Sequence, residues 1–181
     1  MSKAGKLSRE EEILLQGFSS DVSKKSNAVF YTISTVVALG PIYLFYGIHQ
    51  MEPSDSWIVW LISVIVASTL LGTAYRNTKQ LLKDQIIVKR GDAIAREVTK
   101  QFADDKKISK IEKEQRILWR KSEVGDYEAT TFSIFYNNII FLSTFLVLSF
   151  WILGAFNPSI NCILSLAAAG GLAALFSTAK Q

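Results

Sequence analysis

Four long stretches of this 181-residue chain contain no aspartate, glutamate, lysine or arginine. They cover residues 28–48, 57–75, 132–153 and 160–178. A helix of this length measures roughly 28–33 Å at ~1.5 Å per residue, which is close to the ~30 Å hydrocarbon thickness of a bilayer. The absence of charge over such lengths excludes an ordinary soluble domain. It predicts an all-α, polytopic membrane protein with four transmembrane helices.

Side chains that carry chemistry are also scarce. The single cysteine, Cys162, excludes an internal disulfide, and its place inside the fourth stretch predicts a packed thiol. The single histidine, His49, stands at the end of the first stretch beside no candidate ligand, so we expect an interfacial polar residue. The sequence shows no nucleophile–base pair, no phosphate-binding glycine-rich loop and no metal-ligand spacing. We therefore expect no enzyme activity, no cofactor and no metal.

Ionisable residues at bilayer depth, which mark ion and proton pathways, are missing from all four stretches. The most polar pair is Asn137 and Asn138. These amides are expected to hydrogen-bond another helix or, alternatively, to line a cavity. The fourth stretch is crowded with small residues such as Gly170 and Gly171, which permit close helix approach within the chain or to a partner. A small transporter or channel subunit remains the alternative function.

Lysine and arginine are distributed so as to predict the orientation. Residues 1–27 carry five, residues 76–131 carry fourteen and the last three residues carry one, whereas residues 49–56 and 154–159 carry none. The positive-inside rule places the lysine- and arginine-rich segments in the cytosol. The predicted organisation is a cytosolic N-terminal segment (1–27), a transmembrane hairpin (28–75), a cytosolic helical hairpin (76–131), a second transmembrane hairpin (132–178) and a cytosolic tail (179–181).

The charged connection, residues 76–131, contains no proline and reads as two helices joined by a turn. Helical spacing over 76–102 places Ile87, Ile94, Val98 and Phe102 on one face. Residues 103–109 read as the turn, and Ser109 with Glu112 fits a capping box that starts a second helix over 110–121. The side chains expected to share the apolar side of that helix are Ile108, Ile111, Gln115, Leu118 and Trp119.

The other side of this second helix is basic. Over residues 106–121 there are seven basic and two acidic residues, which leaves a net charge of +5. Such a face can be merely solvated, can be attracted to anionic headgroups, or can dock a polyanionic partner such as structured RNA with its proteins. A hairpin that projects from the membrane favours the last reading over lipid. The candidate binding residues are Lys106, Lys107, Lys110, Lys113, Arg116, Arg120 and Lys121.

Three segments resemble a known family. They are the run RILWRKSEVGDYEATTFSIFYNN (116–138), the segment LLQGFS (14–19) and the turn FNPS (156–159). All three are similar to the gamma subunit of the translocon-associated protein complex, also called signal sequence receptor gamma. The resemblance covers essentially the whole chain. One departure is Gly125, where the family tends to have alanine, and we expect it to loosen the entry to the third span.

The resemblance implies a non-enzymatic protein of the endoplasmic reticulum membrane. Its implied partners are the alpha, beta and delta subunits of the same complex, the Sec61 translocon, the ribosome and the lipids of that membrane. The family's cytosolic helices contact the ribosome, and the complex aids co-translational translocation of certain nascent proteins beside the Sec61 channel. Which basic side chains touch RNA is our inference from the arc of cations.

Overall fold

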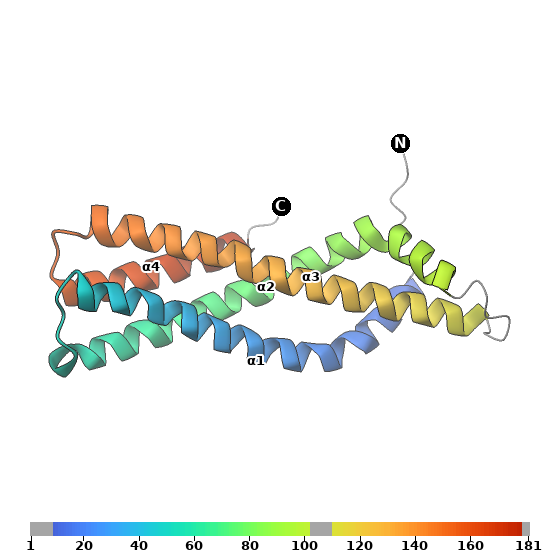
Figure 1. The fold of residues 1–181 in the computed structure, drawn as a ribbon, viewed down its shortest axis with the longest axis horizontal. Coiled ribbons are helices and arrows are strands. Elements are labelled where there is room, and N and C mark those ends of the chain that lie inside the picture. The colour runs from blue at the N-terminus through green and yellow to red at the C-terminus, as the bar shows by residue number, and fades with distance from the viewer. Residues whose placement is uncertain (1–8, 102–109, 179–181) are drawn as a thin grey trace. The chain divides into compact units, whose positions relative to one another are not determined.

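The computed structural model describes residues 9–101 and 110–178, and Figure 1 shows these ranges as helices joined by short connections. The fold is all-α over the described residues, as predicted. The helices are α1 (Arg9–Gly47), α2 (Pro53–Gln101), α3 (Lys110–Val147), the π-helical turn η1 (Leu148–Ile152) and α4 (Pro158–Thr178).

The chain divides into two compact units. The membrane unit comprises Asn27–Thr78 and Ser133–Gln181, and the arm unit comprises Met1–Ser26 and Lys79–Phe132. Within the described residues, four helices are long and apolar enough to cross a membrane. Each of the four charge-free stretches coincides with a large part of one helix, which confirms the prediction of four candidate spans.

Helices α2 and α3 are longer than a single span requires. The helix predicted over 76–102 is confirmed as far as Gln101, and it is continuous with the second span, because α2 is unbroken from Pro53 to Gln101. The prediction that a separate helix ends near Lys121 is wrong, because α3 runs without interruption to Val147. Ser122, Gly125 and Ala129 follow at helical spacing and are all buried, so a packed face carries the helix onward. The predicted turn at 103–109 lies outside the described residues.

Aromatic rings and small side chains fill the membrane unit. Phe30 lies against Tyr75 with ring centroids 5.6 Å apart, and Phe45 meets Phe145 edge-on at 6.0 Å. In a bilayer the lipid tails are as apolar as these side chains, so close packing contributes more than exclusion of water. The small or aliphatic residues buried around the rings include Ala38, Ala67, Leu71, Ala74, Leu166, Ala169 and Ala173.

Polar side chains inside this unit form hydrogen bonds that link α2 with α3. The Asn137 amide donates to Thr78 Oγ1 at 2.9 Å and to the Ser133 carbonyl at 2.8 Å. The Ser133 hydroxyl donates to the Tyr75 carbonyl at 2.9 Å, and the Tyr75 hydroxyl donates to Asn138. The expectation that the two asparagines bond another helix is therefore confirmed. Cys162 is buried and lies 3.7 Å from the Ser63 hydroxyl, as expected of a packed thiol.

The connection between α3 and α4 uses a π-helical turn. Leu153 N–H donates to the Leu148 carbonyl five residues earlier, at 2.8 Å. The carbonyl of Ser149 in this turn accepts a hydrogen bond from the amide of Asn161 at 2.9 Å. His49 stacks between Phe45 and Phe150, with centroid distances of 4.8 and 5.6 Å. The histidine thus belongs to an aromatic stack at the end of the first span.

Two adjacent glycines of α4 face different surroundings, which allows a matched test of the packing. A Cβ on Gly170 would lie 3.1 Å from Leu70 Cβ, whereas a Cβ on Gly171 would meet nothing within 4 Å. Gly170→Val should therefore destabilise the membrane unit by about 1–3 kcal/mol through overpacking. Gly171→Val should leave the melting temperature nearly unchanged. Thermal unfolding in detergent, followed by tryptophan fluorescence, measures both variants. Equal melting temperatures would contradict this packing of α4 against α2.

Candidate functional site

Helices α2 and α3 approach closely inside the arm unit. Ile87, Ile94 and Val98 are buried on α2, as their spacing predicted. A Cβ on Gly125 would lie 2.8 Å from Ile87 Cγ1, which is closer than side chains normally come. The expectation that Gly125 loosens the entry to the third span is therefore wrong. This glycine is instead a point of close contact between α3 and α2.

A buried ion-pair cluster lies beside this contact. The Asp126 carboxylate is 2.8 Å from Lys79 Nζ and 3.4 Å from Lys83 Nζ, and all three side chains are only 10–13% exposed. Arg90 of α2 pairs with Glu128 of α3 outside the buried cluster, with the arginine side chain 58% exposed. Paired charges at low exposure interact strongly because little solvent screens them. The pairs orient α2 and α3 against each other and stiffen the arm unit.

Sequence reasoning missed this cluster, although a signal was present. Asp126 lies four residues after Ser122 and three before Ala129, and these flanking residues are on the buried face of α3. A carboxylate on a packed face needs a cationic partner. Lys79 and Lys83, four residues apart on α2, are the cations that lie opposite Asp126.

The predicted basic residues differ in whether the structure describes them and in how exposed they are. Lys106 and Lys107 lie outside the described residues, and Lys110 is the first residue of α3, with a side chain that is also outside the description. Lys113, Arg116, Arg120 and Lys121 lie on the first turns of α3, where Arg116 and Arg120 are exposed and the two lysines are partly exposed. Arg120 pairs with Glu123 at 2.7 Å on the surface.

Lys121 reaches across to α2. Its Cε and Nζ lie 3.5 Å from the position that a Cβ on Gly91 would occupy. Gly91 of α2 is buried and provides space for this lysine. The aliphatic part of the Lys121 side chain therefore packs against α2. Arg116 and Arg120 are the more exposed of the described cations of α3.

A second basic stripe was not anticipated. Lys89, Arg96 and Lys100 are exposed on α2, and spacings of seven and four place them within an arc of ~40° at ~100° per residue. Buried Ile87, Ile94 and Val98 occupy the opposite side of the helix. Helices α2 and α3 therefore both carry exposed cations on the side away from their contact, and the spacing of Lys89, Arg96 and Lys100 was the signal in the sequence.

The expectation that Trp119 belongs to the buried stripe is wrong. Its side chain is 52% exposed, whereas the preceding Leu118 is buried. One residue corresponds to ~100° around a helix, and the buried face follows Leu118, Ser122 and Gly125. Trp119 therefore offers an aromatic surface beside Arg116 and Arg120.

Fold and site together define a polytopic membrane subunit with a stiff, basic helical arm. The family described as Translocon-associated protein, gamma subunit (TRAP-gamma) matches residues 10–179. A curated protein of Dictyostelium discoideum, Translocon-associated protein subunit gamma, is 30% identical over 162 residues, which cover 90% of this chain and 92% of that protein. The chain belongs to the TRAP-gamma family. It is a translocon-associated subunit and a multi-pass protein of the endoplasmic reticulum membrane.

Proposed function

We propose that this chain is a non-enzymatic subunit that docks the ribosome beside the Sec61 channel and thereby aids co-translational translocation. The observation that carries the proposal is the exposed basic face of α3, with Arg116 and Arg120 outermost on a helix held by buried ion pairs. Ribosomal RNA presents a dense array of phosphates, and guanidinium groups bind phosphate well. A stiff arm presents these groups with little loss of conformational entropy on binding.

The same proposal includes the orientation. With both termini and the charged connection in the cytosol, all twenty lysines and arginines lie on the side where the ribosome binds. The two short connections then face the lumen. Lumenal domains are supplied by the alpha, beta and delta subunits, which the membrane unit contacts through its outer surface.

The polar groups in the membrane unit favour a scaffolding role for this chain rather than the alternative role of a transporter. Asn137, Ser133 and Tyr75 are engaged in hydrogen bonds between helices. An interhelical hydrogen bond fixes one helix against another and stabilises a bundle in lipid. Anchored in this way, the arm raises the effective concentration of ribosomes at the channel even when each contact is weak.

Ribosome binding by the complex that contains this chain should fall steeply with salt. Each phosphate contact contributes about 0.7–0.9 to the slope of log K against log salt, so contacts from the four described cations of α3 give a slope of about −3. A fourfold rise in salt should then weaken binding by about 60-fold. Co-sedimentation with ribosomes over a range of potassium concentrations measures the slope. A flat response would overturn electrostatic docking and favour apolar contact through Trp119.

A further inference from the structure

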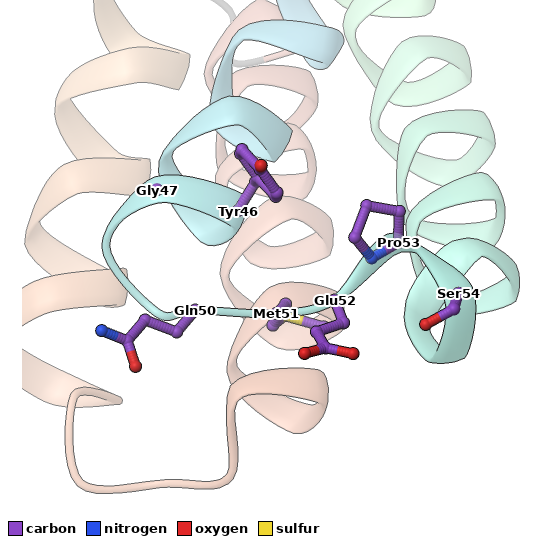
Figure 2. Close-up of a pocket in the computed structure, with 7 residues that line it drawn as sticks. All are labelled: Tyr46, Gly47, Gln50, Met51, Glu52, Pro53 and Ser54. Carbon is purple, nitrogen blue, oxygen red and sulfur yellow. The ribbon is translucent and has the colours of Figure 1, made fainter.

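Two hollows follow each other along α1 and α2 in the membrane unit. The first, which we call the head hollow, has a volume of about 630 Å³ and is lined by Tyr46, Gly47 and residues 50–54. Figure 2 shows the Gln50 amide and the Glu52 carboxylate on the connecting segment, with Pro53 and Ser54 where α2 begins. Volumes of about 300–1,000 Å³ are typical of small-molecule sites.

The second hollow, the chain groove, is apolar. Its volume is about 330 Å³, and Leu39 and Ile42 of α1 and five residues of α2 between Trp57 and Ile65 line it. Ile42 precedes Tyr46 by four residues and Trp57 follows Ser54 by three, so the groove begins one helical turn beyond the head hollow on the same two helices. Side chains on its rim, Leu39, Trp57 and Leu61, are about half exposed, so the groove opens sideways.

The turn that forms the head hollow is firmly held. Gln50 adopts a positive φ of 52°, which is uncommon for a residue other than glycine. The next residue, Met51, is buried, and its N–H donates to the Phe45 carbonyl at 3.2 Å. Burial of Met51 therefore fixes the segment that carries Glu52, so the site exists before a ligand arrives.

The charged side chains near the head hollow indicate which class of ligand it can bind. Within residues 49–56 the charged side chains are Glu52 and Asp55, both exposed, and no lysine or arginine is present. A carboxylate and a tyrosine ring in one hollow favour an organic ammonium group, through ion pairing and cation–π attraction. They disfavour a headgroup with net negative charge. A polar hollow beside an apolar groove fits a molecule with a polar head and a hydrocarbon chain.

We propose that the head hollow and the chain groove together bind one zwitterionic phospholipid, with its headgroup ammonium against Glu52 and Tyr46 and one acyl chain along Leu39, Leu61 and Ile65. This site is separate from the basic face of α3 and does not rest on ribosome docking. It gives the protein a selective contact with the leaflet that its short first connection faces.

Native mass spectrometry of the complex tests headgroup selectivity. The probes are phosphatidylcholine and phosphatidylglycerol with identical acyl chains, added in equal amounts. Wild type should retain phosphatidylcholine about fivefold over phosphatidylglycerol, and Glu52→Lys should abolish or reverse that ratio. Asp55→Lys is the matched control, because it makes the same charge change at a residue that does not line the head hollow. This variant should keep the preference for phosphatidylcholine. Equal retention of the two lipids by wild type, or the same loss in both variants, would overturn the proposal.

A photo-crosslinking residue at Leu61 identifies the occupant of the groove in intact membranes. The expected product is an adduct with the mass of a phospholipid, enriched in choline or ethanolamine headgroups relative to an adduct at Leu175, which is exposed on α4. A crosslink from position 61 to another protein chain would show that a partner helix fills the groove, and an adduct without headgroup enrichment would show bulk lipid. Either result would refute a specific lipid site.

Discussion

Exchanging Lys110, Lys113 and Arg120 for glutamate should weaken ribosome binding by about 100-fold at a physiological salt concentration of about 0.1–0.15 M. Each reversal replaces attraction to phosphate by repulsion, and a loss of about 1 kcal/mol at each of three positions corresponds to roughly that factor. The slope of log K against log salt should also become shallower by about two, because two of the four counted contacts, those of Lys113 and Arg120, are removed and each contributes about 0.7–0.9. Equilibrium co-sedimentation of the purified complex with ribosomes gives both quantities.

The second basic stripe offers a control of equal charge. Glutamate at Lys89, Arg96 and Lys100 changes the net charge by the same six units on an exposed face of α2. If α3 is the docking face, this triple variant should weaken binding by less than about tenfold, because long-range attraction is screened beyond ~8–10 Å at physiological salt. Equal losses in the two variants would contradict a specific face and leave only the net charge of the arm unit. Unchanged binding in the α3 variant would remove its basic face from the mechanism.

Much of this fold could be predicted because charge is costly inside a bilayer. Four stretches without charged side chains identified the four candidate spans, since few other environments tolerate such runs. Helical spacing of Ile87, Ile94 and Val98 correctly identified the buried face of α2. These patterns are local, and they can be read from one stretch of chain at a time.

What escaped prediction depends on contacts between distant segments. The second arm helix was expected to end near Lys121, and Gly125 was separately expected to loosen the chain, whereas contact with Ile87, 38 residues earlier, makes Gly125 a packing position. The burial of Asp126 depends in the same way on lysines of α2. Trp119 is exposed although the preceding Leu118 is buried, because one residue turns a helix by ~100°. Whether Lys113, Arg116 and Arg120 bind RNA stays a prediction, because that contact involves another molecule.

Asp126→Asn should destabilise the arm unit by about 3 kcal/mol. The substitution keeps the size of the side chain but removes the carboxylate shared by Lys79 and Lys83, and breaking a buried ion pair costs about 3–5 kcal/mol. We expect the lower end of that range because both lysines have further interactions. Amides of α2 and α3 around the ion pairs should exchange with deuterium about 100-fold faster, since local opening becomes easier by that free energy. Hydrogen–deuterium exchange with mass spectrometry resolves these segments.

Two comparisons separate the buried charge from general damage to the helix. Glu123→Gln removes a carboxylate from the same helix, but its pair with Arg120 is about half exposed and three residues apart, so exchange should change by no more than about twofold. Replacing Lys79 and Lys83 by methionine together with Asp126→Leu should recover much of the loss, because apolar residues of similar volume often substitute for a buried ion pair without cost. If Asp126→Asn behaves like Glu123→Gln, the cluster does not hold the arm unit. If the triple variant is no more protected than Asp126→Asn, then the charges are required for the packing of α2 on α3, and a stiff arm cannot be built from apolar contacts alone.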